Sequence, residues 1–564
     1  MAKYLVTSAL PYANGPLHFG HIAGVYLPAD IFTRHKKLQG HQIIHISGSD
    51  EHGVAIMQNA QKKKKSYQEY VNQWHKTHKS LFDDYEIQFE FFGQTSAPYH
   101  KEETLLWFES LYRKGLIEKK AEDQLQCQSC HNYLPDRFVE GTCYVCDYEE
   151  ARGDECPKCG EWIDAVKLKN PVCKFCGSKD IEVKSVDQWY LMLTKFSKEY
   201  REWFETRKPE WRKTVSSAID SLTKEGMVDR AITRDLDWGI DVPLEEAKGK
   251  KFYVWFDAPI GYVSNTKEYC QTSGEDYLAD WWQNDDVEIV NFIGKDNVIF
   301  HGIIFPMMSL ASGRANAVTH LPANQYVNLL GKQFSKSKGW YVDADKAIKE
   351  FGPDALRYAL TTLIPENNDS SFTWDGFEAK INNELANNIG NFVNRGMTFF
   401  YKNWKEEGID ATHFQSFFKT EAFLDLQTRV KEINATLDRI EIRRGLEQVM
   451  SLGQVANTYF SDHEPWAVIK VDKDKCAEII AHSAIYALTL GCLFSTYLPN
   501  LSSKILEYFP DINDDLLRDI YTGEFKLGRE YFNQTIVLTK KPKGLVKKVE
   551  ADRIKELNEV LQSL

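Results

Sequence analysis

The spacing of apolar and polar residues predicts that the chain begins with alternating strands and helices and ends in helices alone. Residues 4–8 form an apolar run typical of a buried strand, and residues 19–38 carry apolar positions at helical spacing up to Gly40. Further short apolar runs predict strands at residues 42–46, 252–256, 287–293, near Val318 and at 326–330. Long amphipathic helices are predicted over residues 376–527, and one more near the end of the tail.

This order of elements predicts an α/β fold with a Rossmann-like parallel sheet, followed by an α-helical bundle domain. A length of 564 residues agrees with several domains. The expected segments are the two halves of the α/β domain at 1–115 and 231–325, an insertion at 116–230, a region with a Gly-bounded loop at 326–385, the helical domain at 386–530, and a tail with a terminal helix at 531–564.

Composition and charge exclude some classes of protein. Hydrophobic residues make up 43% of the chain, which is typical of a folded globular protein. No stretch approaches eighteen uninterrupted apolar residues and no apolar leader follows Met1, so we expect a cytoplasmic protein without a membrane span. The net charge of −12 disfavours general nucleic-acid binding, but a local basic surface would be enough for an RNA partner.

Eight of the eleven cysteines form four Cys-x-x-Cys pairs, which predict metal sites in a reducing compartment rather than disulfides. Four thiolates bind one tetrahedral zinc ion, so eight predict two zinc ions. The pairs could combine sequentially or in a nested order. We predict the nested order, because the short loop 147–155 can close one site and leave the outer pairs to meet at the base of the insertion. The two ligand sets are then Cys143, Cys146, Cys156 and Cys159, and Cys127, Cys130, Cys173 and Cys176. Both would be structural, because four thiolates leave no open coordination position.

Two short motifs are candidates for binding phosphate. His18 and His21 lie where the first loop enters the first helix, so they share a face near the positive end of the helix, and Gly20 allows close approach to the backbone. Such a histidine pair by itself is more often a surface or core feature. About 310 residues downstream, a loop between Gly331 and Gly339 contains Lys336, whose ammonium could contact the phosphates of a nucleotide.

Polar and aromatic residues follow several of the predicted strands, where α/β sheets bind ligands. Asp50 follows the second strand and could pair with a substrate ammonium, although a helix N-cap is an equal alternative. Trp255 and Tyr262 follow the run at 252–256, and spacing alone favours core positions for them. Asp296 follows the run at 287–293 and could accept a hydrogen bond from a ribose hydroxyl.

Residues 9–21, Ala-Leu-Pro-Tyr-Ala-Asn-Gly-Pro-Leu-His-Phe-Gly-His, resemble the first signature of class I aminoacyl-tRNA synthetases in its methionyl form. Residues 333–337, Gln-Phe-Ser-Lys-Ser, are similar to their second signature, Lys-Met-Ser-Lys-Ser. The chain departs from it at Gln333 and Phe334 and keeps Lys336. The neighbouring Lys332 is the candidate to replace the missing first charge.

The resemblance implies that the chain uses ATP to form methionyl-adenylate and then transfers methionine to the terminal ribose of initiator and elongator methionine tRNAs. It implies catalysis by His18, His21 and Lys336 together with Mg²⁺ bound to ATP, without a covalent enzyme intermediate. The implied ATP-binding residues are His18, Gly20, His21, Gly294, Asp296, Val327 and Lys336. The implied methionine-binding residues are Leu10, Tyr12, Asp50, Trp255, Ala258, Pro259, Tyr262 and His301. The residues implied to read the anticodon are Asn391, Arg395 and Trp466, although without the resemblance a core or helix-entry position is favoured for Trp466.

Three other classes compete with this interpretation. Synthetases for isoleucine, leucine and valine carry a much larger editing insertion, and the cysteinyl enzyme places zinc in its amino-acid pocket. A small-molecule nucleotidyltransferase would share the histidine turn but not the long helical domain. A zinc-ribbon RNA-binding scaffold would leave Lys336 without a role. Family members often dimerise through an appended oligonucleotide-binding domain, and residues after Leu527 are too few to form one, so we expect a monomer.

Overall fold

The computed structural model describes residues 2–134, 138–153, 156–159, 163–224, 226–335 and 339–562. Its centre is a five-stranded parallel sheet in the order β13-β12-β1-β2-β3. The strands are β1 (Lys3–Ser8), β2 (Gln42–Ser49), β3 (Phe91–Gln94), β12 (Val287–Gly294) and β13 (Ala323–Asn324). The strand order reverses at β1, which lies between β2 and β12. The crevice at the carboxyl ends of these strands is therefore the expected ligand site.

Helices cover the sheet, and the apolar runs of its strands are buried. The first helical segment runs without a break from α1 (Phe19–His21) through a wider turn to α2 (Leu27–Leu38), as predicted for residues 19–38. The other helices of this domain are α3 (Val54–Lys62), α4 (Tyr67–Asp84), α5 (Pro98–Arg113), α8 (Val254–Asp257), α9 (Ile260–Ser273) and α10 (Phe305–Ser312).

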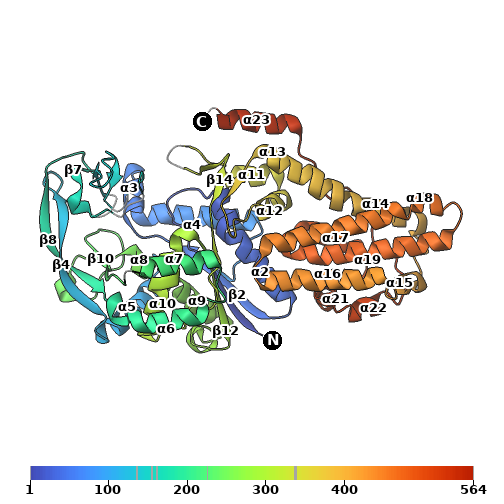
Figure 1. The fold of residues 1–564 in the computed structure, drawn as a ribbon, viewed down its shortest axis with the longest axis horizontal. Helices are drawn as coiled ribbons and strands as arrows, with labels where there is room; N and C mark the ends of the chain where they lie inside the picture. The colour runs from blue at the N-terminus through green and yellow to red at the C-terminus, as the bar shows by residue number, and fades with distance from the viewer. Residues whose placement is uncertain are drawn as a thin grey trace.

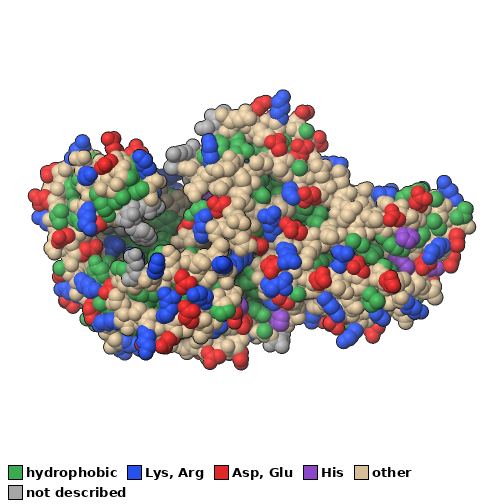
Figure 2. All heavy atoms as spheres, viewed as in Figure 1, with side chains coloured by type: hydrophobic (Ala, Val, Ile, Leu, Met, Phe, Trp, Pro, Cys, Tyr) green, Lys and Arg blue, Asp and Glu red, His purple; other side chains and the backbone are tan. Residues whose placement is uncertain are grey.

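The insertion extends from the sheet as a long hairpin (Figure 1). Its strands β4 (Ile117–Cys127) and β8 (Ile181–Leu191) pair antiparallel over their whole length, and β9 (Arg230–Ala231) adds to β8. A second small sheet contains β5 (Val139–Thr142), β6 (Ala151–Arg152) and β7 (Lys169–Cys173). The helices α6 (Ser197–Arg207) and α7 (Lys213–Thr223) then lead the chain back to the central domain. Seen from the same side, the surface is hollowed between the insertion and the centre of the molecule (Figure 2).

The strand predicted at residues 252–256 is wrong. The strand β11 is only Lys251–Phe252, and α8 and α9 follow at once. A short apolar run cannot be assigned to strand or helix by periodicity alone, and here Phe256 is buried from the helix α8. The strand predicted near Val318 lies instead at Ala323–Asn324, and β3 was not predicted because Phe-Phe-Gly-Gln is too short to show alternation.

A small sheet follows the central domain, with β14 (Val327–Leu329) between β15 (Lys332–Gln333) and β16 (Ser370–Phe372). It is followed by helices, as predicted for residues 376–527. The main ones are α13 (Trp374–Ala379), α14 (Asn391–Trp404), α15 (Ala411–Phe417), α16 (Glu421–Asp438), α17 (Ile442–Asp462), α18 (Pro465–Val468), α19 (Lys473–Tyr497), α20 (Pro499–Leu506), α21 (Asp514–Tyr521) and α22 (Lys526–Tyr531). In the part of the chain that is described, α19 has the length and composition to cross a membrane, but 94% of its most apolar stretch is buried among the other helices.

A buried arginine in the segment between the two domains connects the helical domain to the central domain. Arg357, on α12 (Pro353–Thr361), donates from Nη2 to Asp30 Oδ2 of α2 at 2.7 Å and from Nε to the carbonyl of Tyr497 at 2.7 Å. The tail returns to the segment before α14, because the backbone of Val549 forms two hydrogen bonds with the side chain of Asn382. The terminal helix α23 (Ala551–Gln562) then lies beside α13 (Figure 1).

Candidate active site

A pocket of about 340 Å³ opens at the carboxyl ends of β1 and β2. All eight residues predicted to bind methionine line it, namely Leu10, Tyr12, Asp50, Trp255, Ala258, Pro259, Tyr262 and His301. The lining residues that the sequence did not indicate are Ala9, Gly53, Val54, Ala55, Leu236, Tyr253, Val254 and Asn297. Most of them lie within a few residues of a predicted ligand-binding residue, and this proximity in sequence is the signal that could have identified them. Leu236 had none, because a distant segment brings it into the wall.

Asp50 is the charged residue in this mostly apolar lining. Its side chain is buried, and its Oδ1 atom has no hydrogen-bond partner. Burial raises the pKa of the Asp50 carboxyl well above its ordinary value, and the nearby Asp257 carboxylate raises it further. The loop is held by two backbone bonds, from Ala13 N to Asp50 O at 2.8 Å and from Asp50 N to Pro11 O at 3.0 Å. A buried acid with one unpartnered oxygen in an apolar wall is suited to binding a cation, because the cation would supply the missing partner and favour the charged form of the acid.

Behind the pocket, Asp257 is held between two histidines. Its Oδ2 lies 2.7 Å from His52 Nδ1 and 3.4 Å from His100 Nε2. Burial alone would raise the pKa of Asp257, but His52 and His100 keep it below its ordinary value. Asp257 is therefore a charged carboxylate whose Oδ2 is paired with two histidines, although its Oδ1, like that of Asp50, has no hydrogen-bond partner. Asp50 differs because no histidine, lysine or arginine forms an ion pair with it in the described part of the chain.

The polar end of the pocket is a pair formed by Tyr262 and His301. The Tyr262 hydroxyl lies 2.7 Å from His301 Nε2, and His301 Nδ1 lies 3.2 Å from the carbonyl of Asn297. A carbonyl only accepts, so Nδ1 has the proton and Nε2 accepts from Tyr262. Burial lowers the pKa of His301 to about 4, which keeps the ring neutral. In this arrangement His301 has no N–H left to donate to a methionine sulfur.

The histidine turn begins α1 with both rings bonded to backbone N–H groups. Gly20 N donates to His18 Nδ1 at 3.2 Å, and His18 N donates to His21 Nδ1 at 3.1 Å. Both Nδ1 atoms therefore accept, so each neutral ring has its proton on Nε2. The turn thus provides two Nε2–H donors at the N-terminus of a helix, where an anion is favoured.

The second motif meets the first at this turn. Leu330 and Gly331 both have positive φ, 49° and 77°, which gives the tight turn between β14 and β15. The Phe334 ring then stacks on His18, with centroids 4.5 Å apart. Ser335 and Trp340 exchange backbone hydrogen bonds of 2.8 and 2.9 Å that close the base of the loop. Lys336 lies outside the described residues. The Lys332 ammonium lies over the Trp340 ring, 5.5 Å from its centroid.

The remaining residues predicted to bind ATP lie at the ends of β12 and β14. Gly294 ends β12 and pairs with Asn324 of β13. Asp296 accepts a hydrogen bond from the hydroxyl of Tyr326, the residue before β14, and this bond orients the Asp296 carboxylate. Val327 is buried in β14. Gly294 and Asp296 therefore lie on the β12 side of the point where the strand order reverses, whereas Val327 belongs to the separate small sheet.

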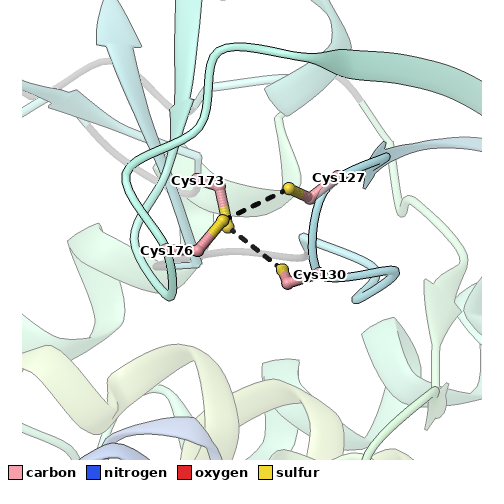
Figure 3. A group of neighbouring side chains, drawn as sticks. All are labelled: Cys127, Cys130, Cys173 and Cys176. Carbon is pink, nitrogen blue, oxygen red and sulfur yellow. Dashed lines mark hydrogen bonds between the residues drawn. The ribbon is translucent and has the colours of Figure 1, made fainter.

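The eight cysteines form two groups in the nested order that the sequence predicts. Within each group the four sulfur atoms lie within 4.8 Å of one another. Figure 3 shows the outer group, in which Cys127 and Cys130 face Cys173 and Cys176, with sulfur–sulfur distances of 3.5 and 3.7 Å. The corresponding distances in the inner group are 4.0 and 3.6 Å. A tetrahedron with Zn–S bonds of about 2.3 Å has sulfur–sulfur edges of about 3.8 Å, so both groups can hold zinc.

At the far end of the helical domain, the structure brings Arg395 of α14 and Trp466 of α18 together. The Arg395 guanidinium lies 5.4 Å from the Trp466 ring centroid and 5.1 Å from that of Phe460. Trp466 is 40% exposed, so it is not a core residue. Asn391 is exposed one helical turn before Arg395.

Comparison with known proteins identifies the family of this chain. The family described as "tRNA synthetases class I (M)" matches residues 4–397, and the "Anticodon binding domain of methionyl tRNA ligase" matches residues 416–559. This chain belongs to the methionyl-tRNA synthetase family. The activity of the chain is that of a methionine–tRNA ligase.

Individual relatives are similar in sequence to this synthetase along most of its length. The methionine–tRNA ligase of Flavobacterium psychrophilum is 40% identical over 89% of this chain and 73% of the relative. That of Chloroherpeton thalassium is 37% identical over 98% of this chain and 81% of the relative. A crystal structure of Mycobacterium tuberculosis methionyl-tRNA synthetase bound by methionyl-adenylate shares the fold, with a TM-score of 0.77 over 97% of this chain and all of that chain at 19% identity.

Asn391, Arg395 and Trp466 are called the anticodon patch below, and the two family matches divide them. Asn391 and Arg395 lie in the class I match, whereas Trp466 lies in the anticodon-domain match. The patch is therefore built by the first helix of the bundle together with the later helical domain.

Proposed function

We propose that the pocket binds methionine with its ammonium on Asp50 and its side chain against Trp255 and Tyr262. The observation that carries this proposal is the unpartnered Oδ1 of a buried carboxylate in an otherwise apolar wall. An ammonium would supply the missing partner. Methionine has a flexible, polarizable side chain, and aromatic rings give its sulfur favourable contacts. Because His301 is neutral and bonded on both nitrogens, the wall offers no charge apart from Asp50 to a competing charged side chain.

For the first step, we propose that a methionine carboxylate oxygen attacks the α-phosphorus of ATP in line. The bond from that phosphorus to the bridging oxygen breaks, and pyrophosphate leaves with the electron pair. The Nε2–H groups of His18 and His21 would donate to phosphate oxygens as charge develops, and Lys336 would contact the pyrophosphate end. Gly294, Asp296 and Val327 would hold the nucleoside. Mg²⁺ bound to ATP would offset charge on its phosphates.

In the second step, a hydroxyl of the terminal ribose attacks the carbonyl carbon of the adenylate, and AMP leaves. The test of the whole proposal is pyrophosphate exchange into ATP with each of the twenty amino acids, followed by charging of methionine tRNA. Exchange that depends on methionine alone supports the assignment. Exchange with isoleucine, valine or cysteine at equal efficiency would contradict the proposed pocket.

We propose that both cysteine groups bind zinc, so that metal analysis of the purified protein is expected to give two zinc ions per chain. Their sulfur–sulfur distances, and the lack of an open position among four thiolates, support structural sites. Cys130→Ala and Cys146→Ala are each expected to remove one ion, because they belong to different groups. Cys270→Ala, a buried cysteine outside both groups, is the matched control and should retain two. Fewer than two ions in the unmodified protein would contradict the count.

We propose that Asn391, Arg395 and Trp466 contact the anticodon, and Trp466→Ala tests this. Loss of a stacked base costs about 1–3 kcal/mol, so the efficiency of tRNA charging is expected to fall about 10- to 100-fold. Pyrophosphate exchange, which needs no tRNA, should stay at its original rate, because the patch is on another domain.

The matched control for Trp466 is Trp404, which is 4% exposed on the same domain. Trp404→Ala should lower the melting temperature, whereas Trp466→Ala should leave it unchanged. If Trp466→Ala lowers melting and both activities together, then Trp466 is a packing residue and the proposed anticodon contact is wrong.

We also propose that the chain acts as a monomer in the cytoplasm on both initiator and elongator methionine tRNAs. Every residue proposed for methionine, ATP and the anticodon belongs to one chain, so a second copy is not needed to complete a site. Light scattering on the purified protein measures the oligomeric state, and a stable dimer would contradict this proposal.

A further inference from the structure

The His18 ring contacts two other rings. The centroids of His18 and His21 are 3.8 Å apart, with planes at 41°. The centroids of His18 and Phe334 are 4.5 Å apart, with planes at 14°. The contact with Phe334 is a near-parallel stack between residues 316 positions apart in sequence, and it joins the two signature motifs directly.

The stack restricts the plane of the ring on which the proposed chemistry depends. His18 Nδ1 accepts from Gly20 N at 3.2 Å, and this bond requires the ring to keep its orientation. The bond alone leaves the ring able to tilt, whereas flat contact with Phe334 on one face opposes tilting. With both contacts present, the Nε2–H of His18 points in one fixed direction.

Gly20 shows how closely these groups are packed. A Cβ atom at Gly20 would lie 3.0 Å from His18 Nδ1 and 3.4 Å from Phe334 Cδ2. A side chain there would therefore push the His18 ring out of its hydrogen bond or away from Phe334. Phe334 itself is only partly buried, so its position is not explained by core packing alone.

Phe334 directly follows a short strand and comes before the loop. The tight turn at Leu330 and Gly331 orients β15, and Phe334 follows β15 directly. The bonds between Ser335 and Trp340 then close the base of the loop immediately afterwards. Gln333, which replaces the first lysine of the second signature, is exposed on β15 and supplies no charge.

We propose that Phe334 is a positioning residue that holds the His18 imidazole in the orientation needed to donate to the phosphates of ATP. In this chain the second signature acts on the first through an aromatic stack, in addition to the ammonium of its retained lysine. The proposal rests on the proposed function of His18 as a phosphate donor.

The test compares Phe334→Leu, which keeps an apolar side chain but loses the stack, with Phe334→Tyr, which keeps the ring. In pyrophosphate exchange, Phe334→Leu is expected to lower kcat about 3- to 10-fold with the KM for methionine unchanged, as expected for the loss of one aromatic contact. Phe334→Tyr should stay within about 2-fold of the original kcat. If Phe334 served folding alone, Phe334→Leu would lower the melting temperature without lowering kcat at an unchanged KM.

A spectroscopic measurement reports on the stack independently of activity. In protein labelled with ¹³C-histidine, the His18 ring protons should be shifted by the Phe334 ring current, and the shift should be lost in Phe334→Leu and kept in Phe334→Tyr. The control is Trp340→Leu, which alters the base of the same loop without contacting the His18 ring. It should keep the ring-current shift. An equal loss of kcat in Trp340→Leu and Phe334→Leu would mean that loop anchoring is responsible, and would overturn the proposal.

His18→Asn separates this proposal from the one on which it rests. If His18→Asn leaves exchange at its original rate, the proposed function of His18 is wrong and the role of Phe334 fails with it. If His18→Asn lowers kcat at least 10-fold and Phe334→Leu has no effect on kcat, then only the proposal for Phe334 is overturned.

Discussion

Asp50→Asn is expected to raise the KM for methionine about 10²- to 10³-fold and, at the same time, to make the unliganded protein more stable. Removing one partner of a buried, hydrogen-bonded charge pair costs about 3–5 kcal/mol, and here the ammonium of the substrate would be left without a counter-ion. Without methionine, the same substitution is expected to stabilise the folded protein. The carboxylate is buried with one oxygen unpartnered, and a neutral amide avoids the cost of burying that charge, typically about 1–3 kcal/mol.

The stabilisation should depend on pH with a definite sign. Burial raises the pKa of Asp50 in the folded protein, so the folded state holds this proton more tightly than the unfolded chain does. The stability contributed by Asp50 is therefore present at pH below its unfolded value, about 4, and is lost as pH rises towards its raised folded value. The free energy of unfolding of Asp50→Asn should therefore exceed that of the original protein by an amount that grows over the same pH interval and is constant above it.

Thermal melting at pH 5 and pH 8, with and without methionine, measures both effects on one preparation. Added methionine should raise the melting temperature of the original protein and have little effect on Asp50→Asn. Asp257→Asn is the matched control, because Asp257 is an equally buried carboxylate but is paired with His52 and His100. It should destabilise the protein. If Asp50→Asn behaves like Asp257→Asn, then Asp50 is a structural residue and the proposed ammonium site is wrong.

Lys336→Ala is expected to slow adenylate formation by about 10²-fold or more, equivalent to about 3 kcal/mol of lost transition-state stabilisation. The resemblance of residues 333–337 to the second signature motivates this expectation, since the structure does not describe Lys336 itself. Binding of methionine without ATP should barely change, because the lysine would face the pyrophosphate and not the amino acid. Single-turnover rates of adenylate formation measure the effect directly.

Two neighbouring residues provide the controls for Lys336. Gln333→Ala should have a much smaller effect, because a neutral, exposed amide offers no charge to the leaving pyrophosphate. Lys332→Ala tests whether this lysine replaces the missing first charge. Its ammonium lies over the Trp340 ring, so an effect well below that of Lys336→Ala is expected. Equal losses in Gln333→Ala and Lys336→Ala would contradict this assignment of roles.

Features that depend on residues close together in the chain could be predicted from sequence. The four Cys-x-x-Cys pairs and the short loop 147–155 predicted the nested ligand groups, because a short loop brings its two ends together in almost any fold. The helix at 19–38 was also predicted correctly, since its periodicity extends over twenty residues. The eight predicted methionine contacts came from resemblance, and they line one pocket.

Features that depend on contacts between distant residues were decided by the tertiary structure alone. The run at 252–256 was assigned to a strand, and only its packing shows that the chain turns into α8 there. Leu236 enters the pocket from a segment with no local signal. Whether Asp50 is paired, and whether Phe334 contacts His18, depends on where the fold places groups far apart in sequence. The sequence by itself therefore determined most of the element types, the grouping of the eight paired cysteines and the motifs, while the charge state of the pocket and the stack between the two signatures arise only from long-range packing.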